Sequence, residues 1–157
     1  MSTLVRHVMT ESPKTLGSAR SAEDAAGLMA QYDVGVIPVV DDGQMVGLVT
    51  DRDLVLRVLA ARADPAQVRL GSILTEVLVS ASPDMRLGQA RELMQRHRVR
   101  RLPVMKADRL VGIVSLGDLA VADPSRRAIG DTLEAISRSD ATSDTNPGPT
   151  IGTPERP

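Results

Sequence analysis

Hydrophobic and polar residues follow the same order in two blocks of the chain. Residues 34–54 read VGVIPVVDDGQMVGLVTDRDL, and residues 99–119 read VRRLPVMKADRLVGIVSLGDL. In each block, a short apolar run that contains a proline precedes a polar turn and a second apolar run, which is typical of two strands and a turn. The runs are residues 36–40 and 45–49 in the first block, and 102–105 and 110–114 in the second. Each block therefore predicts a hairpin.

A helical pattern precedes each predicted hairpin. Ser21 can cap the first helix, whose apolar residues recur at i, i+3, i+4 and i+7. These faces comprise Ala25, Leu28, Met29 and Tyr32 in the first copy, and Ala90, Leu93, Met94 and His97 in the second. Similar spacing predicts a short leading helix in the first ten residues, with a counterpart at Leu70–Leu74, and a short strand follows around Lys14–Leu16.

The two copies are an internal repeat. At a constant offset of 65 residues, thirteen positions between Thr10 and Leu54 are identical in both copies. Each unit reads strand, helix, strand, strand, helix, and at about 60 residues it is too small to bury a large core alone. The predicted class is therefore α/β (α+β), with two units packed as a pseudo-twofold pair.

Boundaries follow from the same pattern. We expect the first repeat with its leading helix at residues 1–61, a linker at 62–68 and the second repeat at 69–122. A further helix is predicted at 123–138. Residues 139–157 are rich in Ser, Thr, Pro and Gly, and this composition predicts a disordered tail.

Composition narrows the function classes. The chain has one Tyr and no Phe, Trp or Cys, which excludes aromatic cages, disulfides and cysteine metal sites. Its net charge of −1 gives no global reason to expect nucleic acid or an anionic membrane as partner. Neither a signal peptide nor a membrane span is evident, so a cytoplasmic protein is expected.

Two short motifs carry the candidate chemistry. Thr50 and Asp53, and likewise Ser115 and Asp118, place a hydroxyl and a carboxylate at the start of a helix. A helix N-terminus favours an anion, and a carboxylate can accept two hydrogen bonds from the vicinal diol of a ribose. The same spacing also forms a capping box, which would only start the helix. Both interpretations remain open at this point.

Other classes have weaker support. The chain has two histidines, His7 and His97, and none of the usual catalytic motifs, so we expect no enzyme and no metal site. His97 takes the helix position of Tyr32 and is expected to be packed. The basic run at residues 96–101 could contact a phosphate backbone, but no recognition helix or stacking aromatic accompanies it, and no nucleic-acid partner is expected.

The repeated Ile37-Pro38-Val39 and Leu102-Pro103-Val104 strands, the glycine strands and the Thr/Ser-x-x-Asp motifs resemble the CBS domain. Residues 1 to about 122 are similar to the tandem CBS pair, or Bateman module, of small stand-alone bacterial proteins. The resemblance implies that the Asp of one copy holds a ribose beside the proline-bearing strand of the other copy. Its favoured cleft comprises Thr50, Arg52, Asp53, Arg100, Arg101 and Leu102.

The resemblance also implies a reciprocal cleft formed by Ser115, Asp118, Val36, Ile37 and Pro38. This second cleft receives no cation from the motifs, because Leu116 and Gly117 replace Asp51 and Arg52. Since bonds from guanidinium to phosphate are among the stronger polar contacts, a phosphorylated ligand should prefer the Asp53 cleft and leave the other weak or empty.

The function implied is a non-catalytic regulatory module that binds an adenine nucleotide (AMP, ADP or ATP) or S-adenosylmethionine, with no required cofactor. A homodimer and an unknown partner protein are expected. The alternative is a stress-associated interaction module without ligand.

Overall fold

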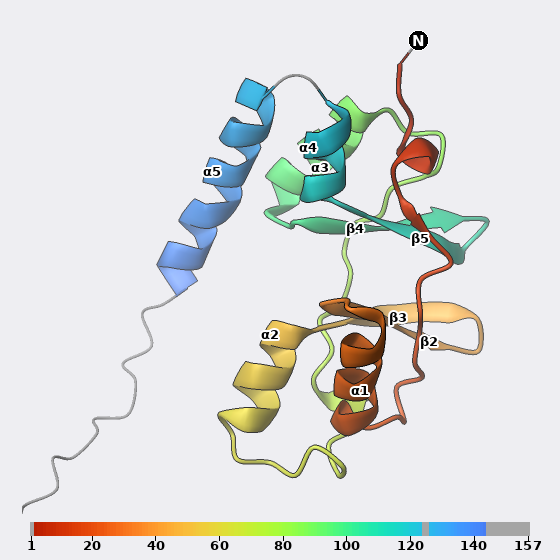
Figure 1. Ribbon diagram of the computed structural model, residues 1–157, viewed down its shortest axis with the longest axis vertical. Helices are drawn as coiled ribbons and strands as arrows, with labels where there is room; N and C mark the ends of the chain where they lie inside the picture. The colour runs from red at the N-terminus through yellow and green to blue at the C-terminus, as the bar shows by residue number, and fades with distance from the viewer. Residues whose placement is uncertain (1, 124–125, 144–157) are drawn as a thin grey trace, which may run out of the picture.

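The computed structural model describes residues 2–123 and 126–143 and divides them into two similar halves. The first half contains α1 (Ala22–Tyr32), β2 (Val36–Asp41), β3 (Gln44–Thr50), α2 (Asp51–Leu54) and the π-helical turn η2 (Val55–Leu59). The second contains α3 (Leu87–His97), β4 (Arg101–Lys106), β5 (Arg109–Ser115) and α4 (Leu116–Ala122). The 3₁₀ turn η3 (Leu70–Ser72) precedes α3 in the chain but packs in the first half. In Figure 1 the two hairpins face each other at the middle, and the helices of each repeat lie on the outer sides. The predicted mixed fold with two packed repeats is confirmed.

The two hairpins share one register. Val36 pairs with Thr50 in the first hairpin, and Arg101 pairs with Ser115 in the second. Both hairpins also have an irregularity at equivalent places, between Val39 and Val40 and between Val104 and Met105. The register places the residue that begins each proline-bearing strand directly opposite the hydroxyl residue of its own repeat.

The leading segments are exchanged between the repeats. Val5 is fully buried in the core of the second repeat, and its N–H donates to the carbonyl of Met85 at 2.8 Å. Strand β1 (Thr10–Glu11) then pairs with β5 of that repeat. Conversely, Leu70 and Ile73 pack in the core of the first repeat. Each repeat is therefore completed by residues that precede the other one.

Two glycines allow this exchange. A Cβ on Gly47 would lie 2.6 Å from the carbonyl oxygen of Thr75, and a Cβ on Gly112 would lie 2.7 Å from Sδ of Met9. Both distances are shorter than a carbon atom tolerates, so each glycine admits the leading segment that crosses its strand. A backbone carbonyl also approaches Gly112, where a Cβ would lie 2.9 Å from the carbonyl oxygen of Thr10.

Several local predictions need correction. The leading helix of the first ten residues is only the 3₁₀ turn η1 (Val5–His7), because the chain must be extended again at Thr10 to pair with β5. The strand expected at Lys14–Leu16 is reduced to a single bridge between Leu16 and Val39. The helix predicted from Asp51 begins there, but its later part is the π-helical η2.

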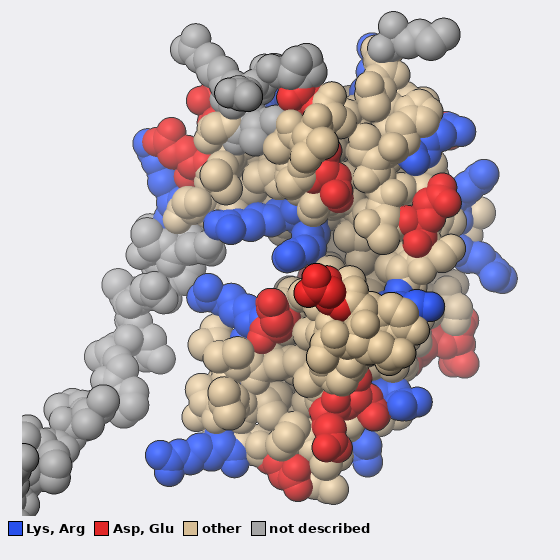
Figure 2. All heavy atoms as spheres, in the orientation of Figure 1, with Lys and Arg blue, Asp and Glu red and all other residues tan. Residues whose placement is uncertain are grey.

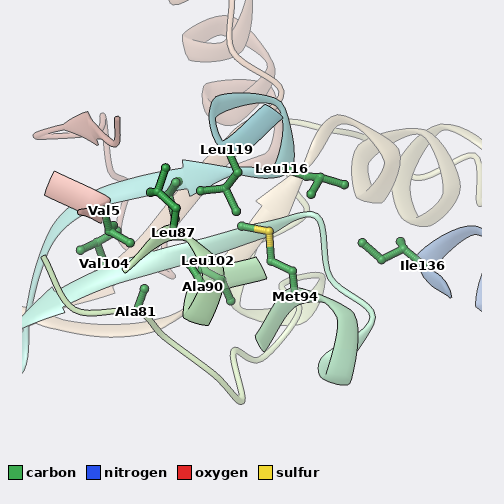
Figure 3. Close-up of a cluster of buried hydrophobic side chains, with 11 residues drawn as sticks. Val5, Ala81, Leu87, Ala90, Met94, Leu102, Val104, Leu116, Leu119 and Ile136 are labelled. Carbon is green, nitrogen blue, oxygen red and sulfur yellow. The ribbon is translucent and has the colours of Figure 1, made fainter. Parts of the chain in front are cut away.

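The cores are built from aliphatic side chains and Met, as the composition requires. In the second repeat the buried cluster includes Leu87, Met94, Leu102 and Leu119 (Figure 3). The prediction that Tyr32 and His97 lie on the packed faces of their helices is wrong, because Tyr32 is 44% exposed and His97 is exposed as well. Both lie in the last turn, just before the helix ends.

Helix α5 (Arg126–Ser143) packs on α3 and α4 at the outside of the second repeat. It extends past residue 138, where the prediction ended it, so residues 139–143 are helical rather than part of a disordered tail. The rest of the predicted tail, residues 144–157, lies outside the described residues. Within the described ranges, no helix has the length and apolar character needed to cross a membrane.

Candidate functional site

A cavity of about 680 Å³ lies between the two repeats. Its volume falls within the range of about 300–1,000 Å³ that small-molecule sites occupy. Figure 2 shows a hollow between the two halves of the molecule with Lys or Arg and Asp or Glu side chains at its edge. Residues from both repeats line the cavity, among them Thr50, Arg52, Asp53, Arg100 and Arg101. Five of the six residues predicted for the favoured cleft therefore share one cavity.

Thr50 and Asp53 form the start of α2. The Thr50 N–H donates to the Asp53 carboxylate at 2.8 Å, and the Asp53 N–H donates to the Thr50 hydroxyl at 3.2 Å. Arg57 lies one turn later, with its Nε 3.8 Å from the second Asp53 oxygen. The capping-box interpretation of this motif is confirmed. With its side chain 13% exposed, Asp53 also lines the cavity.

The backbone amides at the start of α2 are already engaged. The Asp51 N–H donates to the carbonyl of Gly35 at 3.0 Å, and the Arg52 N–H donates to the Asp51 carboxylate at 2.8 Å. The next amide is the one that bonds Thr50. The expectation that an anion would bind to free amides at this helix start is therefore wrong, because all three N–H groups already have acceptors. Positive charge for an anion must therefore come from side chains.

Four arginines supply that charge. Arg52 belongs to the first repeat, whereas Arg98, Arg100 and Arg101 belong to the second, and all four line the cavity. Arg98 is the residue that ends α3, in a left-handed conformation with φ 54°. Three carboxylates, those of Asp51, Asp53 and Glu76, share the cavity, so its ionised side chains carry a formal excess of one positive charge (four arginines minus three acids).

The residues predicted for the reciprocal cleft separate in the structure. Val36 lines the cavity of Thr50, because strand pairing places it opposite Thr50 in the same hairpin. Ile37 and Pro38 are buried. Leu102, predicted for the favoured cleft, is also fully buried in the core, since strand alternation turns it away from the side that Arg101 occupies.

Ser115 and Asp118 repeat the capping box at the start of α4. The Ser115 N–H donates to the Asp118 carboxylate at 2.7 Å, and the Asp118 N–H donates to the Ser115 hydroxyl at 3.1 Å. Neither residue lines the cavity between the repeats. The two motifs thus match in hydrogen bonding and differ in their surroundings.

Sequence reasoning missed part of the cavity wall. The segment from Thr75 to Val79 lines it, and Leu78 in this segment is 86% exposed. His97 and Ile136 line it as well. The internal repeat could have indicated that residues 75–79 line the cavity, because they directly follow the leading segment that packs on β3. Nothing in the sequence places Ile136 at this cavity.

The described residues were also compared with the arrangement that a metal site requires. Among residues 2–123 and 126–143, no group of three or more His, Cys, Asp or Glu side chains is arranged to hold a metal ion.

Comparisons with known proteins agree with the duplicated architecture. The family model described as "CBS domain" matches residues 5–60 and again 70–125. The CBS domain-containing protein YhcV of Bacillus subtilis (strain 168) is 42% identical over 133 residues, which are 85% of this chain and 94% of that protein.

Solved structures give the same result. The crystal structure of Hypoxic Response Protein I, which has two coordinated zinc ions, matches with a TM-score of 0.69 and 32% identity and covers 78% of this chain and 100% of that chain. The CBS domain pair of protein MJ0100, in complex with 5'-methylthioadenosine and S-adenosyl-L-methionine, matches with a TM-score of 0.69 and 26% identity and covers 78% and 96%. This chain belongs to the CBS domain family and contains two copies of that domain.

Proposed function

We propose that this CBS pair is a non-catalytic sensor that binds an adenine nucleotide in the cavity between its repeats. The observation that carries the proposal is the joint presence of Asp53, Arg98 and Arg101 in one cavity of about 680 Å³. Asp53 offers the carboxylate that a ribose diol needs, and the guanidinium groups offer charge for phosphate. The adenosyl ligands of the MJ0100 pair support the same class of ligand.

The cavity walls suggest how the ligand lies. Val36, Val77 and Leu78 form an apolar part of the wall suited to the base, and Asp53 lies next to Thr50 for the ribose. Because the backbone amides of α2 are engaged, the phosphates are assigned to the arginines. Four guanidinium groups favour two or more phosphates over S-adenosylmethionine, whose sulfonium group is itself a cation.

A ligand in this cavity would contact both repeats at once. Its binding free energy then favours the arrangement in which they close on it, and a partner that distinguishes the two arrangements receives the signal. The Asp53 carboxylate accepts one capping bond, from the Thr50 N–H, and the backbone N–H of Asp53 donates the other to the Thr50 hydroxyl.

Titration calorimetry with ATP, AMP, adenosine and S-adenosylmethionine tests the proposal. Arg101→Ala should weaken ATP binding by about 10- to 100-fold and leave adenosine unchanged, because a hydrogen bond to a charged group contributes about 1.5–3 kcal/mol. Arg109→Ala, an exposed arginine at the far end of the same hairpin, is the matched control and should bind ATP like wild type. Absence of heat with all four ligands would refute the sensor and favour a ligand-free interaction module.

The outer face of the first repeat supports the expected homodimer. Val55, Leu56 and Leu59 of η2 are 51%, 53% and 73% exposed. Exposed apolar side chains grouped on one helical turn are typical of an interaction surface. At the equivalent place of the second repeat, Val121 of α4 is 92% exposed as well. We therefore propose that a second copy of the chain docks on η2.

A further inference from the structure

Helix α5 reaches the cavity although it lies outside the duplicated unit. The segments that match the CBS domain end at residue 125, and α5 begins at Arg126. Ile136 of α5 is 2% exposed and belongs to the buried cluster of the second repeat. Figure 3 shows Ile136 pointing from α5 toward Met94 and Leu116. The same residue lines the cavity between the repeats.

The second repeat is adapted to carry this helix. Leu116, the first residue of α4, is 7% exposed, whereas the equivalent residue of the first repeat is the exposed Asp51. An apolar residue at this place is favourable only where another element covers it. Arg91 on α3 also bonds the Asp123 carboxylate at 2.7 Å, just before the connection to α5. The docking of α5 is therefore specified by the sequence of the second repeat.

Burial along α5 is described for residues 130–138. Of its described side chains, Thr132 and Ile136 are buried, while Leu133 is 44% exposed. A helix that packs on the outside of a domain opens locally at a lower free energy than the strands of the core. The position of α5 is therefore sensitive to any molecule that adds or removes a contact with Ile136.

We propose that α5 is a wall of the ligand site and that nucleotide binding fastens it to the second repeat. This inference rests on the proposed function. A ligand that fills the cavity contacts Ile136, so occupancy stabilises the docked helix. By linkage, the docked helix raises the affinity for the ligand by the same factor. Helix α5 is then the element whose docking reports occupancy to a partner.

Hydrogen exchange and calorimetry on the full chain test this coupling with ATP as the probe. At an ATP concentration of about 100 times Kd, exchange of the amides at residues 130–138 should slow by a factor approaching about a hundred, the limit set by mass action. Ile136→Ala, which removes three carbon atoms, should weaken ATP binding by at least about tenfold, since the loss of one methylene group in an apolar pocket already has an effect of this order. Leu133→Ala, on the exposed side of the same helix, should match wild type in both measurements.

Each outcome has one meaning. Wild type that binds ATP without slowing of α5 exchange, or Ile136→Ala with unchanged affinity, refutes the coupling and leaves the nucleotide site intact. Failure of wild type to bind ATP refutes the site and the coupling together. If Ile136→Ala does not fold, the exchange measurement on wild type alone decides.

Discussion

Asp53 and Asp118 offer an internal comparison that separates a ligand role from a capping role. Each carboxylate accepts an N–H from the hydroxyl residue three positions earlier, at 2.8 Å for Asp53 and 2.7 Å for Asp118. Each amide in turn donates to that hydroxyl, at 3.2 Å and 3.1 Å. Only Asp53 lines the cavity. Replacing each with Ala therefore removes the same capping bond, the one that the carboxylate accepts, from different surroundings. Asp53→Ala also removes the 3.8 Å contact with Arg57.

The expected magnitudes differ accordingly. Loss of one capping bond costs about 1 kcal/mol, so both variants should lose about 2–4 °C in Tm for a chain of this size. Asp53→Ala should also lose two charge-assisted bonds to the ribose, each about 1.5–3 kcal/mol, which lowers ATP affinity by at least about a hundredfold. Asp118→Ala should retain wild-type affinity for ATP.

Thermal unfolding with and without ATP measures both effects in one experiment. At 100 times the wild-type Kd, ATP should stabilise wild type and Asp118→Ala by about 2.7 kcal/mol, and Asp53→Ala by almost nothing. Equal ATP stabilisation of the two variants would show that Asp53 only caps α2, and the assignment of the ribose to it would be abandoned.

Four further predictions concern the exchanged segments, one glycine, one cap and the outer face. Val5→Ala should lower the free energy of unfolding by about 2–3 kcal/mol and speed amide hydrogen exchange in α3 and β4 of the second repeat, where Val5 is buried. Faster hydrogen exchange confined to α1 would contradict the packing of the leading segment on the second repeat. Gly47→Ala should cost about 1–3 kcal/mol in chemical unfolding, because its Cβ would lie 2.6 Å from a carbonyl oxygen. Hydrogen bonds from Arg20 and Ser21 lower the pKa of Asp24 to about 2. The ionised carboxylate therefore stabilises the fold above about pH 4, and this stabilisation is lost as the pH falls through about 2. Asp24→Asn should make the free energy of unfolding depend less on pH between about pH 4 and 2. Leu59→Asp should convert a dimer to a monomer in sedimentation analysis, and an unchanged mass would exclude η2 from the interface.

The fold could be predicted from the sequence where local chemistry decides it. The proline-bearing strand, the polar turn and the glycine strand each have a local pattern, and the hairpins follow that pattern in both repeats. The cap of α1 by Ser21 and the start of α2 at Asp51 follow from hydrogen bonds within one turn. These features depend on residues that are close together in the chain, so they can be predicted from the sequence alone.

The remaining features depend on contacts between distant segments. Whether Val5 packs on its own repeat or on the other cannot be read from its apolar spacing, which is the same in both cases. The sequence gives no hydrogen-bond acceptor for the Asp51 N–H. In the structure this N–H donates to the carbonyl of Gly35, which lies beside it at the end of the hairpin. Arg98 reaches the cavity because α3 ends in a left-handed residue at that position. Tertiary geometry settles each of these points.

Duplication explains why a small chain can have a cavity with two unlike walls. Two identical repeats around a twofold axis would place the same residues on both sides of the seam. In this chain Gly35 and Val36 of the first repeat correspond to Arg100 and Arg101 of the second, and Arg52 corresponds to Gly117. These differences collect arginines from both repeats at the Asp53 side. The repeats therefore supply a common framework, and the three differences Gly35/Arg100, Val36/Arg101 and Arg52/Gly117 give the seam its unequal distribution of positive charge.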